Sequence, residues 1–426
     1  MKKITTIICF VGVSLIYCMT ALCQGESAVP FLLIGSSPEG NGMGGSSATT
    51  PTTDALATIS NPGQLGLFSL RDEFNAGTFA PRTDWLPQFG IRGLNYGATA
   101  INAGYNFAEL LSLPFSLSAG LGYSRTSINL GTFVVTMPGS PTFLGTFNSN
   151  ESSEAFSAAI GVEYFARLGI GFNFKRIESN LSPTGIGQPA GTGSAHAPAT
   201  DFGLLLDVPI AGIISEIAQT RLEIATDISP FLDLSFAYVE SNVGGTIVYA
   251  DAAQPDPLPR TVTAGLSFEV GLHSTAGSSH WKLASFRLAR QADDLLVVRK
   301  PDGSFDYQSG LGDIQFVDNV ILGKLNPRAA IRKGWQLQVA EVFYLRRGSS
   351  DNQGLAYSTS GYSICLAGFL KLLGTVSPEL GKDSWIGFAA EHFDLQYHSS
   401  KYEGTGSPIL GTTFASLNLV VRGFEL

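Results

Sequence analysis

Residues 261–272 read Thr-Val-Thr-Ala-Gly-Leu-Ser-Phe-Glu-Val-Gly-Leu, and this stretch decides the class of fold. Hydrophobic residues occupy every second position, and small or polar residues such as Ser267 and Glu269 lie between them. Successive side chains of a β-strand point to opposite faces, so the segment predicts a strand with one apolar and one polar face.

The same alternation recurs along the chain, most clearly in residues 116–123, 156–164 and 232–238. Further strand candidates are residues 72–80, 88–107, 128–137, 169–176, 200–208, 281–290, 335–346, 361–371, 385–397 and 413–424. Residues 88–107 fit either one long strand or two. Many short amphipathic segments separated by turn residues are typical of a β-barrel, and counting them predicts about 14 strands.

A soluble β-sandwich shows the same alternation, so composition has to decide between the two folds. Charged residues make up only 14% of the 426 residues, against about 25% in soluble proteins. No segment beyond the N-terminal region is long and apolar enough for a transmembrane helix. Because a closed barrel is the other way to satisfy the backbone in lipid, we expect an all-β, transmembrane antiparallel β-barrel.

The N-terminus has the pattern of a secretory signal peptide. Lys2 and Lys3 precede an apolar run at residues 4–19, and cleavage is expected after Cys23, with an uncleaved anchor as the alternative. Cleavage leaves Cys365 as the single cysteine, which excludes an intramolecular disulfide framework. Loss of the two lysines changes the net charge from −9 to −11, and this acidity argues against nucleic acid as a partner.

Between the strands we expect four long external loops and a few helical segments. The loops are predicted at residues 137–153, 179–199, 249–260 and 349–360. Helical character is predicted at residues 48–59, 209–218 and 318–325. The expected organisation is a signal peptide at residues 1–23, an N-terminal plug segment at 24–70 and the barrel at 71–426.

Residues 31–67 do not alternate like strands and instead contain a series of short motifs. The first is the glycine run Gly42-Met43-Gly44-Gly45, which suits a close approach to other backbone. Asp54 follows, and then a turn at Asn61-Pro62-Gly63 that ends in Leu65.

This order of motifs resembles the start of the PorV/PorQ family, a branch of the FadL-like outer-membrane barrels. The glycine run matches the family, but Gly63 stands where the family has Ala and Gln64 where it has Gly. The resemblance covers about 35 residues, and it implies that the segment folds inside the barrel as a plug beside a side opening in the wall. It also implies the outer membrane as the location.

Two functions follow from the resemblance. The first is a PorV-like accessory of protein secretion, of the type IX kind, that binds secretion machinery or exported proteins. The alternative is a FadL-like passive channel for hydrophobic small molecules. Phe31, Leu32, Leu33 and Met43 would then line part of an apolar track, although anchoring the plug to the wall is the simpler role for them.

Chemistry-bearing residues are sparse. Neither a nucleophile elbow nor a zinc or nucleotide motif is present, so we expect no enzyme, cofactor or metal. Glu163, Asp233 and Glu269 fall on polar strand faces, where they are expected to face the lumen and bind Arg, Lys or backbone, with ligand passage as the alternative. His392 and His398 are expected as exposed residues at the rim, with a metal site formed together with Asp394 as the alternative.

Overall fold

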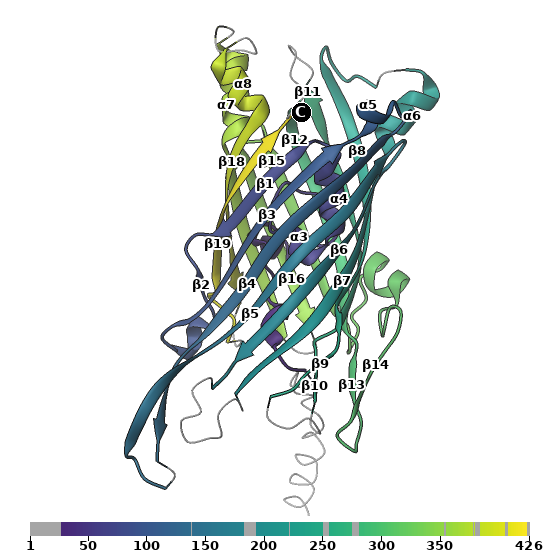
Figure 1. Ribbon diagram of the computed structural model, residues 1–426. Helices are drawn as coiled ribbons and strands as arrows, with labels where there is room; N and C mark the ends of the chain where they lie inside the picture. The colour runs from purple at the N-terminus through teal and green to yellow at the C-terminus, as the bar shows by residue number, and fades with distance from the viewer. Residues whose placement is uncertain are drawn as a thin grey trace, which may run out of the picture.

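The computed structural model describes residues 27–137, 139–182, 193–220, 222–249, 255–274, 281–352, 355–377, 379, 384–404 and 408–423. The predicted signal peptide and its cleavage site lie outside these residues. Fifteen strands form one antiparallel sheet; β2 pairs with β3 alone, and the other fourteen close into a barrel because β1 also pairs with β3 (Figure 1). The predicted antiparallel barrel of about 14 strands is confirmed.

The barrel strands follow one another in chain order around the wall. They are β1 (Glu73–Phe79), β3 (Leu94–Asn106), β4 (Ser116–Thr136), β5 (Phe143–Glu163), β6 (Arg167–Asn180), β7 (Ser194–Pro209), β8 (Ile228–Gly244), β11 (Thr261–Ser274), β12 (Trp281–Leu295), β15 (Ala330–Val339), β16 (Phe343–Asn352), β17 (Leu355–Cys365), β18 (Phe393–Glu403) and β19 (Thr413–Arg422). Small pieces outside the ring are β2 (Thr83–Asp84), β9 (Thr246–Ile247), β10 (Asp256–Pro257), β13 (Val297–Arg299) and β14 (Phe305–Tyr307).

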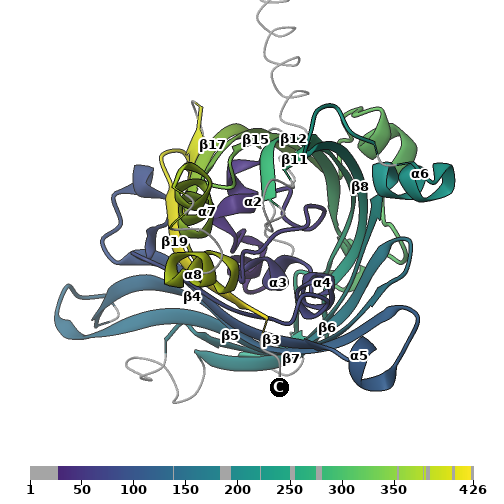
Figure 2. The same cartoon turned by 90° about the horizontal axis from the view of Figure 1, so that it is seen from above.

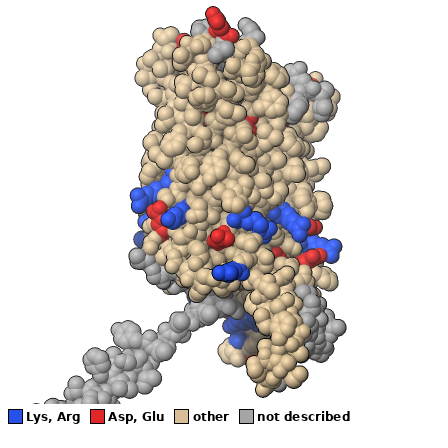
Figure 3. Space-filling model, turned by 90° about the vertical axis from the view of Figure 1, so that its left-hand side faces the viewer, with Lys and Arg blue, Asp and Glu red and all other residues tan. Residues whose placement is uncertain are grey.

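The alternation in the sequence sorts side chains between the lumen and the outer surface. On β11, Ser267 and Glu269 are buried, whereas Phe268 and Val270 are 39% and 42% exposed. On the face drawn in Figure 3, the Lys, Arg, Asp and Glu side chains gather in one band, and a wide region next to it carries almost none. An outer surface with an apolar band of this kind suits lipid rather than water.

The N-terminal segment fills the lumen. Its elements are η1 (Pro30–Leu33), α2 (Pro38–Gly42), α3 (Ala57–Ser60) and α4 (Gly63–Ser69). Figure 2 shows α2, α3 and α4 inside the ring of strands. We call residues 27–70 the plug. The helix predicted at residues 48–59 is wrong for most of its length, since only α3 is helical and the Thr- and Pro-rich stretch before it is not.

The two ends of the barrel differ in their connections. At one end, tight turns at residues 164–166 and 340–342 join β5 to β6 and β15 to β16, and the helical connections that carry α6 (Ile210–Ala218), α7 (Leu366–Val376) and α8 (Trp385–His392) lie there too. Long connections, among them residues 245–260 and 296–329, lie at the other end, which we call the long-loop end (Figure 1). Within the described residues, no helix has the length and apolarity needed to cross a bilayer.

Several predicted strands have the wrong boundaries. Residues 116–123 and 128–137, predicted as two strands, form the single strand β4, and residues 88–107 contain one strand, β3, which begins only at Leu94. Residues 335–346 contain a turn between β15 and β16, because Ala340 and Glu341 adopt positive φ without any glycine or proline to mark the bend. Residues 361–371 and 385–397 are each half helix: β17 continues into α7 (Leu366–Val376), and β18 is preceded by α8 (Trp385–His392). Both helices carry apolar residues at helical spacing. Over a short segment, this spacing is hard to distinguish from the alternation of a strand.

Two predicted loops are also mostly strand. Residues 137–153 belong largely to β5, because β4 and β5 form a hairpin of 21 residues per strand that continues past the apolar part of the wall. Residues 349–360 belong to β16 and β17, which approach within two residues of each other. The helix expected at residues 209–218 is confirmed as α6 (Ile210–Ala218), and the one at 318–325 overlaps η3 (Phe316–Ile321). One further short helix is α5 (Ala108–Leu111).

Candidate functional site

The glycine run of the plug contacts the inner wall of β15–β17. Gly44 and Gly45 have φ of 75° and 88°, a conformation that favours glycine. Gly44 N donates to Thr359 Oγ1 at 2.9 Å, and the same hydroxyl donates to Gly42 O at 2.9 Å. Met43 is fully buried. In the structure, Met43 therefore anchors the plug.

The wall opposite this run is also glycine. A Cβ on Gly334 would overlap the backbone of Met43, and a Cβ on Gly348 would overlap the backbone of Met43 and Gly44. Gly334 and Gly348 face each other across β15 and β16. This pair, which we call the glycine seat, leaves room for backbone to lie on backbone.

A second contact holds the far half of the plug. Asn61 Oδ1 accepts from Gly63 N at 2.8 Å, and Asn61 Nδ2 donates to Ala48 O at 2.9 Å. Gln64 Nε2 donates to Thr50 O at 2.8 Å, so the residue that departs from the family pattern ties two parts of the plug together. Leu65 is fully buried. Wall glycines again form the floor under α4, at Gly104, Gly120, Gly161, Gly169, Gly171 and Gly203.

Buried charged groups connect the plug to the wall. Glu39 on α2 forms an ion pair with Arg346 on β16, with 3.0 Å between Oε1 and Nη2, and both side chains are at most 8% exposed. Thr52 Oγ1 donates to Glu39 Oε2 at 2.6 Å. Burial by itself raises the pKa of Glu39, but Arg346, His398 and the hydrogen bond from Thr52 outweigh it, so the pKa lies below its usual value.

Asp54 organises the turn before α3. Its Oδ1 accepts from Leu56 N at 3.0 Å, and Ser37 Oγ donates to its Oδ2 at 2.6 Å. Burial raises the pKa of Asp54, and the nearby Glu39 carboxylate raises it further.

The same part of the plug is also bound to the last strand of the barrel. Asn418 on β19 accepts from Ala55 N at 3.1 Å and donates to Thr53 O at 2.9 Å. The plug is thus attached to β16 and β19 by polar contacts.

Two of the predicted lumen acids form a charged cluster with basic side chains. Glu269 pairs with Arg287 and with Lys282, whose Nζ lies 3.0 Å from Oε1. Asp233 is opposite Glu269 in the ladder and lies 3.9 Å from Arg167. Arg287 also donates to Pro51 O of the plug at 2.9 Å. Glu163, the third acid, is half-buried at the end of β5, opposite Arg167 in the ladder.

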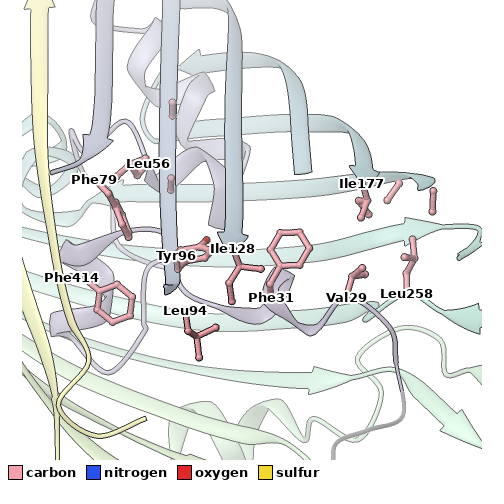
Figure 4. Packing of buried hydrophobic residues seen from close by; sticks show 14 of the residues in the cluster. Val29, Phe31, Leu56, Phe79, Leu94, Tyr96, Ile128, Ile177, Leu258 and Phe414 are labelled. Atoms are coloured by element: carbon pink, nitrogen blue, oxygen red, sulfur yellow. The ribbon is translucent and has the colours of Figure 1, made fainter. Parts of the chain in front are cut away.

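The long-loop end of the lumen is apolar and aromatic. We call the residues labelled in Figure 4 the mouth cluster: Val29, Phe31, Leu56, Phe79, Leu94, Tyr96, Ile128, Ile177, Leu258 and Phe414. Ring centroids of Phe79 and Tyr96 are 5.8 Å apart, and those of Phe79 and Phe414 are 6.1 Å apart. Tyr96 OH hydrogen-bonds to Ser36 Oγ at 2.6 Å. Phe31 of the plug therefore packs in an apolar layer.

The barrel ladder is interrupted beside the mouth cluster. The β1–β19 ladder ends where Phe79 faces Ser416, although β19 begins at Thr413. One further backbone hydrogen bond, from Ala80 N to Ala415 O at 3.0 Å, continues the contact with β19. Past a bend at residues 81–82, the chain pairs only with β3, at Thr83 and Asp84. The wall between the first and last strands is closed there by side chains rather than by a ladder. We call this place the wall interruption.

Sequence reasoning missed several of these residues. The partners of the plug, Arg346, Tyr96 and Phe414, sit in strands that look ordinary one at a time. The glycine seat could have been suspected from the sequence, because Gly334 and Gly348 both fall on inward-facing positions of their strands. His398 was expected at the rim, and this is wrong: it is buried and its Nδ1 is 2.6 Å from Ser363 Oγ. In the described part of the chain, no three His, Cys, Asp or Glu side chains are grouped for a metal ion.

Comparison with known proteins gives distant structural similarity only. The sequence matches no protein-family model and no curated protein. The toluene transporter TbuX of Ralstonia pickettii is 15% identical with a TM-score of 0.40, over 92% of this chain and 99% of that one. The toluene transporter TodX of Pseudomonas putida is 13% identical with a TM-score of 0.36, over 90% and 96%.

A FadL homologue of Pseudomonas aeruginosa is also similar, at 9% identity and a TM-score of 0.35, over 91% of this chain and 98% of that one. These neighbours are FadL-like outer-membrane barrels. At such identities and TM-scores, the similarity says nothing about what this chain transports or binds. The resemblance to the PorV/PorQ family stays a prediction.

Proposed function

We propose that this protein is a plugged barrel of the outer membrane that lets small hydrophobic molecules pass without an energy source. The observation that carries the proposal is the wall interruption, which begins at residues 81–82 beside the mouth cluster. An apolar solute dissolved near the membrane surface would find apolar contacts there on both sides of the wall. Polar solutes would gain nothing from the same path.

The outer membrane is the location that the surface supports. The outward side chains along the strands are large and apolar, and they include Leu121, Phe156, Ile160 and Phe172. We place the long-loop end outside because the tip of the β4–β5 hairpin extends there beyond its ladders to β3 and β6, and outer-membrane barrels carry their long extensions on the external side. The mouth cluster and the start of the plug would then meet solutes arriving from outside.

The plug is built to separate the two ends of such a path. Its start, at Val29 and Phe31, packs in the mouth cluster. Deeper down, α2 is fixed by the glycine seat and the ion pair of Glu39, and α4 by its close packing on wall glycines such as Gly161 and Gly169. A small displacement of the start would open apolar space without disturbing those anchors. Passage would therefore depend on movement of residues 27–36 rather than of the whole plug.

The secretion-accessory function stays a prediction, because no contact in the described residues favours it specifically. Deleting the gene in the source organism separates the two. Our proposal expects unchanged secretion and slower uptake of an apolar compound. Loss of secretion with unchanged uptake would overturn it.

The direct test uses cells that lack their own hydrophobic channel and whose outer membrane excludes the apolar dye N-phenyl-1-naphthylamine. Expression of the full chain is expected to speed the rise of dye fluorescence, with no change in the uptake of a sugar of similar size. Equal dye uptake with and without the protein, in cells where it is folded in the outer membrane, would rule the proposal out.

Tyr96→Phe is expected to raise dye uptake severalfold. The change removes the hydrogen bond to Ser36, worth about 0.5–1.5 kcal/mol, and loosens the start of the plug without emptying the mouth cluster. Ser36→Ala removes the same bond from the other side and should act alike. Tyr362→Phe, on the outward face of β17, is the control and should leave uptake unchanged. Opposite effects of the first two variants would contradict the mechanism.

A further inference from the structure

The connection between β12 and β15 forms a lobe on the outside of the barrel. We call residues 296–329, which include β13, β14 and η3, the outer lobe (Figure 1). Its Leu296, Ile314 and Val320 form one buried cluster with outward-facing Val262 and Ala292 of the wall. Phe316 meets Phe236 of β8 with ring centroids 5.7 Å apart. The outer lobe is therefore packed firmly against β8, β11 and β12.

A groove of about 620 Å³ lies along the edge of the outer lobe. Its apolar lining comes from outward-facing wall residues and from η3 of the lobe. These residues are Leu234, Leu266, Phe268, Leu288, Trp335, Val320 and Ile321. The lining faces lipid, since Phe268, Leu288 and Trp335 are between 37% and 47% exposed. A groove of this kind has the shape and polarity to hold an acyl chain.

Three cations stand together at this groove. Arg290, Lys333 and Arg347 all line it, and Arg290 and Lys333 are opposite each other in the ladder. Arg290 Nη1 donates to Ile321 O at 3.0 Å, which fixes the guanidinium at the edge of the lobe, and its Nε has no partner. Lys333 and Arg347 form neither a hydrogen bond nor an ion pair with any described side chain.

The cations of the groove have no acidic partner among the described residues, unlike two other outward-facing arginines of the wall. Arg125 lies 3.7 Å from Glu154, and Arg176 lies 2.8 Å from Glu178. Asp351 on β16 lines the adjoining pocket together with Arg290 and Lys333, but it forms no ion pair with a described residue. The groove therefore combines an apolar channel with an excess of positive charge.

The position along the wall suits a lipid headgroup. Ser349, which faces Lys333, is close to the end of β16 at Asn352, so the cations lie near the long-loop end of the wall. Cations on a lipid-facing strand cost about 2–4 kcal/mol at mid-membrane and little at the interface, so they are expected at headgroup level. Basic pockets at that level bind anionic headgroups.

We propose that this groove binds a lipid with a phosphate-bearing headgroup from the leaflet at the long-loop end. The phosphate would lie between Lys333 and Arg347, with Arg290 behind it, and an acyl chain would lie along Leu288, Trp335 and the lobe. The proposal rests on the membrane location argued above and is independent of whether hydrophobic molecules pass through the barrel.

The test titrates the purified full chain in neutral detergent micelles and follows binding by native mass spectrometry. The probes are diphosphoryl lipid A, monophosphoryl lipid A and inorganic phosphate. The wild type is expected to bind the diphosphoryl form about tenfold more tightly than the monophosphoryl form, as a lost charge-assisted hydrogen bond would predict. Inorganic phosphate alone should not bind measurably. If it binds as tightly as the lipid, the groove is an anion site and the proposal fails.

The variant that tests the role of the groove cations combines Lys333→Gln with Arg347→Gln. Neither side chain has a partner among the described residues, so the barrel should fold, which heat-modifiable gel mobility checks. The preference for the diphosphoryl form should disappear. Lys401→Gln, an exposed lysine on β18 outside the groove, is the matched control and should keep the preference. A preference that survives in the double variant would overturn the proposal, whatever the dye-uptake results are.

Discussion

Replacing Gly348 by leucine is expected to release the plug from the barrel wall without unfolding the barrel. Any Cβ at this position overlaps the backbone of Met43 and Gly44, so either the strand or the plug has to move. The strand is held by ladders to both neighbours, β15 and β17, whereas the glycine run is held mainly by two hydrogen bonds to Thr359. The plug should therefore give way.

The size of the effect follows from overpacking, which costs about 1–3 kcal/mol. Amide hydrogen exchange in residues 38–47 is expected to speed up by about tenfold to a hundredfold, since about 1.4 kcal/mol corresponds to a factor of ten. Exchange in the strands should change little. Ion conductance in planar bilayers should rise, because the plug fills the lumen.

The control for this variant is Gly245→Ala. Gly245 has no atom near the position of an added Cβ, so exchange and conductance should match the wild type. Normal exchange in residues 38–47 of the Gly348 variant would mean that the glycine seat is not what holds the plug. Loss of the folded barrel at this single position would mean that docking of the plug is needed for assembly of the wall.

The barrel class was predictable because it depends on a pattern that each strand carries by itself. Residues 261–272 show the alternation up to the register shift after Leu272, and within them Ser267 and Glu269 lie inside whereas Phe268 and Val270 lie outside. The same locality explains the errors. Ala340 and Glu341 turn the chain without glycine or proline, and α7 follows β17 directly. Neither boundary can therefore be recognised from the residues next to it.

The plug motifs were recognisable, but their partners were not. Gly42–Gly45 is conspicuous in the sequence, whereas its contact with Gly348 depends on which strand lies opposite it across the lumen. The ion pair of Glu39 and Arg346 joins residues more than 300 positions apart, and neither is unusual locally. His398 was misplaced because its burial comes from the plug and not from its own strand.

The second large effect is expected from Arg346→Met. This change removes the charge that compensates Glu39 while keeping much of the side-chain volume, and both groups are nearly inaccessible to water. Leaving one member of a buried ion pair unpaired costs about 3–5 kcal/mol. Docking of the plug should weaken accordingly, which exchange in residues 38–56 measures, with folding of the barrel followed by guanidinium titration.

The loss of docking free energy comes mainly from burying the unpaired Glu39 carboxylate and only in small part from the lost attraction to Arg346. A double variant separates these two contributions. Glu39→Gln together with Arg346→Met removes both charges, so it should recover a large part of the loss even though it contains one more substitution. Arg125→Gln, which breaks an exposed pair with Glu154, should cost less than about 1 kcal/mol. If the double variant is as unstable as the sum of both single variants, burial of the Glu39 charge is not what couples the plug to the wall, and the attachment depends on its other contacts, such as the glycine seat and Asn418.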